Sequence, residues 1–335
     1  MSNFETRIAL FKEIEKARGA SVVSYLTGDR RQLETQISPE AIDIFVDHLD
    51  AIGPTKKLSL ILYTNGGDTG AAWRLVNLLH TFCDELEVII PAKALSAGTL
   101  ISLGANNIIM TKQAALGPID PSVTHPLNPL VPNAPQVKVP VSVEAVRGYI
   151  DAAKEDLGIK DPHDLVQLLV DLSNKVHPLV LGQIFRSRSQ IRFLARKLLK
   201  RQVDGDEKID KIIDFLCAES GSHDYTINRR EALGLGLRVE KPSDELYQLL
   251  RQVHLSYVSE FKLLEPYDPY SIIAASATAD YVLPRAAIES PKTGSHRFVS
   301  EGTLTKSVIQ QMGPLGPIAQ ESINDTRRFE GWRKQ

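Results

Sequence analysis

Residues 88–105 read VIIPAKALSAGTLISLGA, and this stretch decides the fold. An apolar strand-like segment ends, Ser96 follows in a turn of small residues, and an apolar helix-like segment begins. A serine at such a junction has its hydroxyl near backbone N–H groups that lack partners within the helix. The serine is therefore either a helix cap or the nucleophile of a site whose N–H groups hold a developing oxyanion.

A second apolar strand ends in a similar way upstream. Residues 60–68 read LILYTNGGD, so that the strand runs into the double glycine Gly66-Gly67. Glycine has no side chain, and another group can therefore approach its backbone closely. Two strand ends, one with a serine and one with bare backbone, predict a single acyl-transfer site.

Strand and helix patterns alternate from residue 22 to residue 110, in the order β-α-β-α-β-α-β. Such alternation predicts a parallel sheet with right-handed crossovers. We expect an α/β protein with three parts: an N-terminal helix over 1–20, a catalytic core over 21–240 and a C-terminal part over 241–335. The core contains a proline-rich insertion at 117–143, followed by several helices. The C-terminal part is expected to hold a helix, a small β appendage and a polar, loosely ordered tail.

Composition limits the classes of function. The chain has 335 residues and a net charge of −2, which gives no electrostatic basis for binding nucleic acid or an anionic membrane. Cys83 and Cys217 lie in apolar contexts typical of buried thiols, and no metal site or cofactor motif is found. The first residues do not resemble a signal peptide, and no apolar run is long enough to span a bilayer. We therefore expect a cytoplasmic protein.

The double glycine, the Ser-Ala-Gly turn and the segment LGPIDP at 116–121, in this order, resemble the Clp-protease/crotonase superfamily. The chain is most similar to its serine dehydrogenase proteinase family, which is related to signal peptide peptidase A. The later segment 222–237 is similar to the helix that closes the family's core. The resemblance covers about 20–240 and implies a ββα-superhelix core, usually assembled into homo-oligomeric rings.

The same resemblance implies a serine peptidase that acts on peptide or protein substrates. Carried over residue by residue, the nucleophile is Ser96, and the backbone amides of Gly67 and Ala97 form the oxyanion hole. Ser102 is instead expected to be a polar residue on a packed helix.

The general base is not where the Clp proteolytic subunit keeps its histidine, because the corresponding place reads Ile119-Asp120-Pro121. Three candidates for the base remain: His223, Lys138 and His125. His223 could take the proton from Ser96 while Asp120 orients the imidazole. Lys138 would act as in the Ser–Lys dyad of signal peptide peptidase A, which requires a desolvated lysine. Each of these residues also has an ordinary structural reading as a loop or turn residue.

Two other functions are compatible with the sequence. A crotonase-type enzyme would use the same paired amides to hold the enolate oxygen of an acyl-CoA thioester, without a serine nucleophile. A Clp-like assembly that has lost its base would act as a scaffold.

Overall fold

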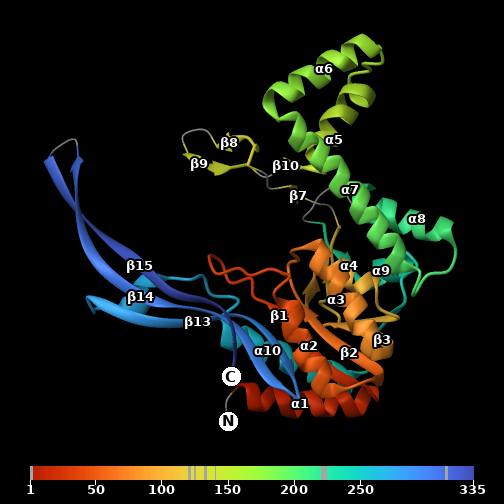
Figure 1. Ribbon diagram of the computed structural model, residues 1–335, viewed down its shortest axis with the longest axis vertical. Helices are drawn as coiled ribbons and strands as arrows, with labels where there is room; N and C mark the ends of the chain where they lie inside the picture. The colour runs from red at the N-terminus through yellow and green to blue at the C-terminus, as the bar shows by residue number, and fades with distance from the viewer. Residues whose placement is uncertain are drawn as a thin grey trace.

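The computed structural model describes residues 3–119, 122–123, 126–131, 134–139, 141–219, 225–313 and 316–335. An α/β core carries two projections, one built of helices and one of long strands (Figure 1). No helix in this described part of the chain is both long and apolar enough to cross a membrane.

An eight-stranded sheet runs through the core in the order β12-β5-β3-β2-β1-β13-β14-β15. The first five strands are parallel to their neighbours, as the alternating pattern predicts. The last three are joined by antiparallel pairing, which begins between β1 and β13. The bounds are β1 Ser21–Thr27, β2 Thr55–Tyr63, β3 Cys83–Ile90, β5 Asn107–Met110, β12 Val239–Glu240, β13 Thr278–Ser290, β14 Gly294–Gly313 and β15 Gly316–Lys334.

Helices cover both faces of the parallel part of the sheet. Leu58, Leu60 and Leu62 of β2 point to one face, into a core shared with α2 (Ala41–Ile52), α3 (Thr69–Phe82) and α4 (Ala97–Leu103). Ile61 and Tyr63 point to the other face, beneath α1 (Asn3–Arg18) and α10 (Asp244–Phe261). Each fully buried leucine contributes roughly 1.5–3 kcal/mol to stability. Because both faces are covered, β2 reads as a nearly continuous apolar run.

A second, small sheet lies beside the end of β3 and has the order β11-β6-β4. Its strands are β4 (Lys93–Ala94), β6 (Ala115–Leu116) and β11 (Ile227–Asn228). β4 runs parallel to β6, and β11 runs antiparallel to it. β3, β4 and α4 therefore form a β-β-α unit, and the expected ββα core is confirmed.

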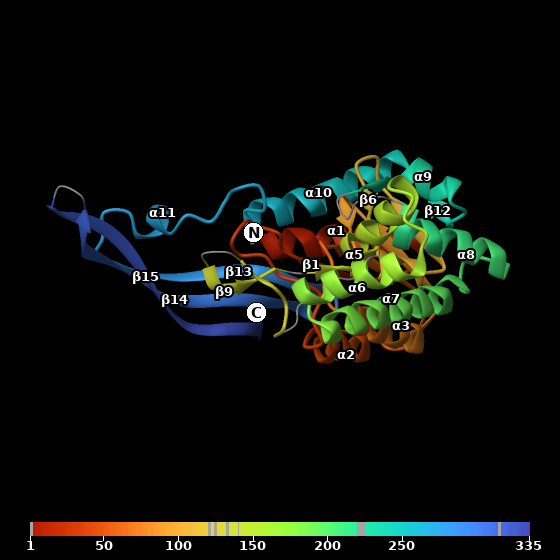
Figure 2. The same ribbon diagram turned by 90° about the horizontal axis from the view of Figure 1, so that it is seen from above.

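The proline-rich connection leads from the core to the helical projection, which consists of α5 (Val143–Asp151), α6 (Pro162–Lys175) and the first part of α7 (Pro178–Leu199) (Figures 1 and 2). The connection carries the short strands β7 (Ser122–Val123), β8 (Leu130–Val131), β9 (Ala134–Lys138) and β10 (Val141–Ser142). β7 pairs with β10, and β8 pairs with β9. The other helical segments are η1 Ala152–Asp156, α8 Asp206–Asp214, η2 Phe215–Glu219 and α9 Arg229–Gly234.

The C-terminal residues continue the main sheet. After α11 (Pro269–Ile273), β13 pairs with β1, and β14 and β15 form a long hairpin that projects from the core. The expectation of a loosely ordered polar end was wrong, because β15 pairs with β14 from His296↔Lys334 to Gly313↔Gly316. A hairpin that leaves the core needs no apolar face, and its polar sequence hides the strand pattern. The division of the chain at residues 20 and 240 stays a prediction.

A buried ion pair joins the N-terminal helix to the C-terminal strands. The guanidinium of Arg7 in α1 donates to both carboxylate oxygens of Glu289 in β13, at 2.8 Å each, and both side chains are fully buried. Tyr257 of α10 donates to the same carboxylate at 2.7 Å and lies 2.6 Å from the hydroxyl of Ser24. Because each charge is paired and hydrogen-bonded, the network holds α1, α10 and β13 together without an unpaired buried charge.

Candidate active site

Ser96 sits in a strained turn immediately before α4. Its backbone angles are φ 51° and ψ −113°, a region close to the mirror image of the extended conformation that suits glycine rather than serine. Its side chain makes no capping hydrogen bond, although the residue occupies the N-cap position. The simple helix-cap reading of Ser96 therefore fails, and the residue is half-buried at the helix start.

The double glycine lies against this turn. A Cβ placed on Gly66 would come within 2.8 Å of the Cβ of Ser96 and 3.2 Å of the amide nitrogen of Ala97. A Cβ on Gly67 would meet the backbone of Ile37 at 2.4 Å. Both glycines have positive φ angles, 114° and 143°. Sterics and backbone conformation thus both require glycine at these two positions.

Hydrogen bonds fix the direction in which the Gly67 amide points. The Ile37 amide donates to the carbonyl of Gly66, and the Asp68 amide donates to the carbonyl of Ile37, both at 2.8 Å. Because alternate residues of an extended strand present their amides to opposite edges, the Gly67 N–H faces away from Ile37. Among the described residues, the amides of Gly67 and Ala97 donate no hydrogen bond in turns, loops or to side chains.

Thr64 holds the two halves of the site together and is fully buried. Its hydroxyl accepts a hydrogen bond from the Gly66 amide at 2.9 Å and lies 2.6 Å from the hydroxyl of Thr27. Its methyl group would be 2.4 Å from a Cβ on Gly98, in the first turn of α4. Its backbone hydrogen-bonds to Lys93 and Leu95, on either side of Ala94. One side chain therefore contacts the glycine loop and the helix that follows Ser96.

Thr99, within α4, connects this helix to β4 and to the segment that follows β6. Its buried hydroxyl donates to the carbonyl groups of Ala94 and Gly117 and accepts from the Gly117 amide at 3.0 Å. These bonds fix the start of the segment that leads to Asp120. Neither Thr64 nor Thr99 was singled out from the sequence, because a threonine at a strand end or in a helix has no distinctive pattern.

Of the residues proposed as the base or its orienting carboxylate, only Lys138 is among the residues that the structure describes. Asp120, His125 and His223 lie outside the described residues. Lys138 is described, at the end of β9, where its exposed ammonium donates to the carbonyl of Pro126 at 2.6 Å. It has not lost contact with solvent as a lysine base must.

Two other polar residues close to Ser96 in the sequence already have partners within the protein. The ammonium of Lys93, three residues before Ser96, pairs with Asp29, which also accepts from the hydroxyl of Tyr63 at 2.9 Å. Ser102 donates to the carbonyl of Gly98 at 2.9 Å, as expected for a packed helix residue. In the described part of the chain, no group of three or more His, Cys, Asp or Glu side chains is placed to hold a metal ion.

Comparison with known families gives the class of protein. The family model described as "ClpP-like SDH-type serine proteinase" matches residues 3–261. The chain belongs to this family of serine proteinases. The match ends before β13, so that the three C-terminal strands lie beyond it.

Two curated relatives come from Methanocaldococcus jannaschii. The chain is 28% identical over 251 residues to the uncharacterized protein MJ0137, covering 73% of this chain and 77% of the relative. It is 28% identical over 254 residues to the uncharacterized protein MJ1495, covering 73% and 75%. Their names assign no activity.

Solved structures with a similar chain path include two variants of the 1510-N membrane-bound stomatin-specific protease, one in complex with a substrate peptide. Both are 16% identical, with TM-scores of 0.38 and 0.37; they cover 65% and 62% of this chain and 79% and 72% of their own. The protein ClpP1 from Listeria monocytogenes is 14% identical, with a TM-score of 0.36, and covers 71% of this chain and 99% of its own. These similarities are too distant to transfer residue roles.

Proposed function

We propose that this protein is a serine peptidase in which Ser96 forms an acyl-enzyme. The observation that carries the proposal is the strained conformation of Ser96, whose side chain makes no capping hydrogen bond. Two N–H groups in the contacting turns, those of Gly67 and Ala97, have no acceptor in turns, loops or side chains of the part of the chain that the structure describes. Strain at a strand-to-helix turn is typical of nucleophilic serines held out from a sheet. The amides of Gly67 and Ala97 are the proposed donors to the oxyanion.

We assign the base to His223 and its orienting carboxylate to Asp120. The described strands support this choice through their directions. β4 and β6 run parallel, and their carboxyl ends lead in the sequence to Ser96 and to Asp120. β11 runs antiparallel to β6, and its amino end follows His223 in the sequence. The carboxyl ends of β4 and β6 and the amino end of β11 therefore lie at the same end of the small sheet. Lys138 is the weaker candidate because its ammonium is exposed and bound to Pro126.

The proposed reaction follows from these roles. The Ser96 hydroxyl oxygen attacks the peptide carbonyl carbon, and its proton passes to the His223 imidazole. The carbonyl oxygen becomes an oxyanion, which accepts hydrogen bonds from Gly67 and Ala97. The C–N bond then breaks as the imidazolium returns the proton to the leaving amine. Water, deprotonated by the same imidazole, hydrolyses the ester and releases Ser96.

Labelling with a fluorophosphonate probe tests the nucleophile. The wild-type protein is expected to be labelled at Ser96, and Ser96→Ala to lose the label with an unchanged circular dichroism spectrum. Ser102→Ala is the matched control and should label normally. Undiminished labelling of Ser96→Ala contradicts the assignment. Acyl-CoA turnover that survives Ser96→Ala would favour the crotonase-type function, and absence of both activities would favour the scaffold.

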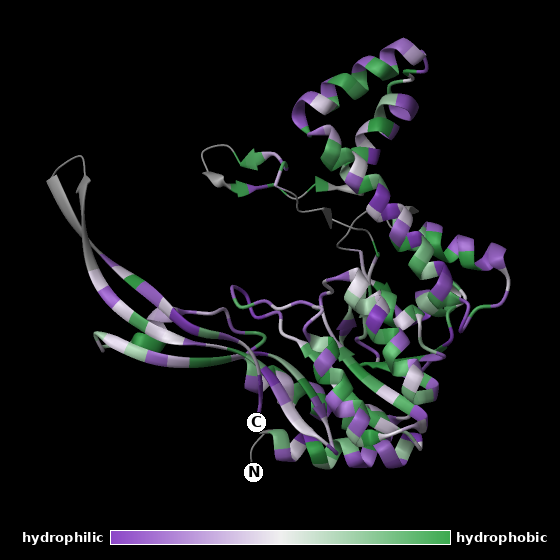
Figure 3. Ribbon diagram, in the orientation of Figure 1, coloured by the Kyte–Doolittle hydropathy of each residue, from purple (hydrophilic) through white to green (hydrophobic). Residues whose placement is uncertain are grey.

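We further propose that the protein forms homo-oligomers through its helical projection. No residue of α6 is buried, although the helix is amphipathic, and Val166, Leu169 and Val170 are 59%, 51% and 47% exposed. Figure 3 shows apolar positions along α6, on the part of the molecule that stands away from the core. Contiguous exposed apolar surface is typical of protein–protein interfaces.

Light scattering after size exclusion tests the assembly. Val166→Asp combined with Leu169→Asp is expected to reduce the oligomer to monomers, whereas Gln167→Asp on the same helix should leave it intact. A monomeric wild-type protein would exclude this part of the proposal. The proposed location is the cytoplasm, because the buried thiol of Cys83, which is in no disulfide, suits a reducing compartment.

A further inference from the structure

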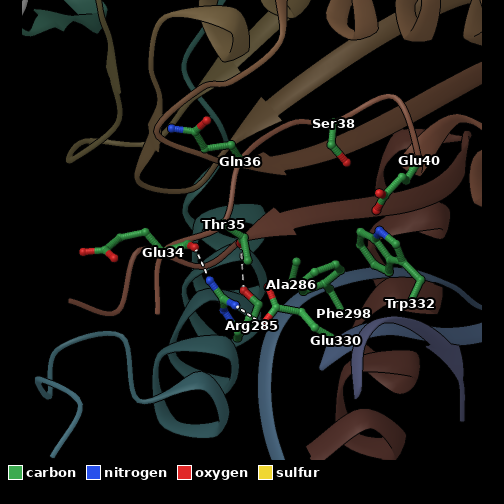
Figure 4. A pocket seen from close by; sticks show the side chains of 10 residues that line it. All are labelled: Glu34, Thr35, Gln36, Ser38, Glu40, Arg285, Ala286, Phe298, Glu330 and Trp332. Carbon is green, nitrogen blue, oxygen red and sulfur yellow. Dashed lines mark hydrogen bonds and ion pairs between the residues drawn. The ribbon is translucent and has the colours of Figure 1, made fainter. Parts of the chain in front are cut away.

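A cavity of about 330 Å³ lies between residues 34–40 and the C-terminal strands (Figure 4). Its floor comes from Ala286 of β13, Phe298 of β14 and Trp332 of β15, all of which lie beyond the residues matched by the family model. Its rim comes from the segment that precedes α2. The cavity is thus a feature that the C-terminal strands add to the family's core.

Two aromatic rings and one carboxylate dominate the open part of the cavity. The rings of Phe298 and Trp332 meet edge to face, with centroids 5.8 Å apart. In Figure 4 the side chain of Glu40 lies beside the indole of Trp332. Glu40 has no hydrogen bond or ion pair among the described residues, and its side chain is exposed. The guanidinium of Arg285 already lies over Phe298, 5.7 Å from the ring centroid. The ring of Trp332, with the Glu40 carboxylate beside it, is the part of the lining that favours a further cation.

The charges at the opposite end of the cavity are already neutralised. Arg285 donates to the carbonyl groups of Leu33 and Glu34 and forms an ion pair with Glu330 at 3.1 Å. Glu330 also pairs with Arg327. The side chain of Glu34 accepts from the amide of Gln32 and points away from the cavity. Glu34 and Glu40 are therefore the lining carboxylates without an ion pair among the described residues, and Glu40 is the one that lies on the Trp332 side of the cavity.

The indole N–H of Trp332 supplies a second recognition element. Its nitrogen is buried and has no acceptor among the described residues. A buried donor without a partner is unfavourable, so that a ligand with a carbonyl oxygen gains by accepting from it. A peptide offers such an oxygen in every residue. The cavity therefore suits a peptide segment that also carries a positive charge.

The cavity adjoins the glycine loop of the active site. Gln36 lines it, and the Cβ of Gln36 lies 2.9 Å from the position that a Cβ on Gly67 would occupy. Ile37, the next residue, forms an isolated β-bridge with Gly67. A group bound in the cavity thus contacts the segment that supports the proposed oxyanion donor.

We infer that this cavity is an exosite that binds a lysine or arginine side chain of a polypeptide. The ammonium or guanidinium lies against Trp332 and pairs with Glu40, while a backbone carbonyl accepts from the Trp332 indole. The inference rests on the proposed function only in taking the ligand to be a polypeptide. It gives the C-terminal strands a role in selecting substrates.

Tryptophan fluorescence tests this inference independently of catalysis. Trp73 and Trp332 are the two tryptophans of the chain. In a Ser96→Ala, Trp73→Phe protein, Trp332 becomes the only reporter. We expect titration with an acetylated alanine pentapeptide carrying a central lysine to change its emission, and the peptides with central glutamate or leucine to bind at least tenfold more weakly. Glu40→Gln should weaken lysine-peptide binding by about fivefold.

Glu34→Gln is the matched control and should leave the affinity unchanged. Absence of binding, equal binding of the three peptides, or equal losses in Glu40→Gln and Glu34→Gln would overturn the inference. Failure of the proposed peptidase function would instead appear as absent fluorophosphonate labelling at Ser96, which this titration does not measure.

Discussion

Gly66 and Ser96 are in such close contact that a single added carbon would separate them: a Cβ on Gly66 would lie 2.8 Å from that of Ser96. Gly66→Ala should therefore displace the serine turn and strain a backbone with φ of 114°. We expect a loss of about 1–3 kcal/mol in the free energy of unfolding and loss of fluorophosphonate labelling. Gly182→Ala, in an open position on α7, should label normally. Normal labelling of Gly66→Ala would show that the turn tolerates displacement.

The hydroxyl of Thr64 can be separated from its methyl group by two substitutions. Thr64→Val keeps the shape but leaves the Gly66 amide without its acceptor, whereas Thr64→Ser keeps the hydroxyl. We expect labelling of Thr64→Val to slow by about tenfold, less than the 10²–10³ typical of losing an oxyanion donor, and Thr64→Ser to be faster than Thr64→Val. Hydrogen exchange of the peptide containing residues 64–70 should accelerate only in Thr64→Val. Equal effects of both variants would assign Thr64 to packing alone.

The strain at Ser96 predicts a gain in stability when function is removed. Ser96→Gly should raise the free energy of unfolding by about 1 kcal/mol, because glycine adopts φ 51° and ψ −113° without steric cost. Ser96→Ala retains the Cβ and should not show this gain, although both variants lose labelling. Urea denaturation measures the difference. Equal stabilities of the two variants would mean that the turn is not strained.

Stability should fall at mildly acidic pH because of a buried histidine pair. His48 lies 2.7 Å from the hydroxyl of Ser290 and 2.9 Å from His296. Burial, His296 and Lys334 lower the pKa of His48 to about 3, from the usual 6.5. Between about pH 3 and pH 6.5 the unfolded chain therefore has a protonated His48, whereas the folded chain keeps it neutral. The contribution of His48 to the free energy of unfolding is thus complete above pH 6.5 and declines below it.

His48→Gln removes this dependence. We expect the stability advantage of the wild-type protein over His48→Gln to shrink by about 2 kcal/mol between pH 7.5 and pH 5. His163→Gln, at an exposed position, should follow the wild-type curve. A constant difference between wild type and His48→Gln across this range would show that His48 titrates normally in the folded protein.

Local patterns predicted the core well and the surroundings of the serine poorly. α4 begins after Ser96, as expected, because the small residues and the apolar run that follow it are local signals. The role of Thr64 depends on a contact with Gly98, and the cavity near Gln36 depends on strands that follow residue 277. Such long-range contacts leave no periodic trace in the sequence. The long strands β14 and β15 were underestimated because the residues beyond Leu304 are mainly polar and show little apolar alternation.

The ion pair between Arg7 and Glu289 has a consequence for how the chain is made. At a synthesis rate of roughly 5–20 residues per second, the carboxylate reaches the ribosome's active centre about 15–60 seconds after the guanidinium, since 282 residues lie between them. Until then Arg7 can pair with Glu260 of α10, but it lacks the carboxylate that receives two hydrogen bonds from its fully buried guanidinium. The first helix of this protein is thus among the last to be fixed in its native position. In a nascent chain that ends before β13, α1 would be accessible to chaperones and proteases.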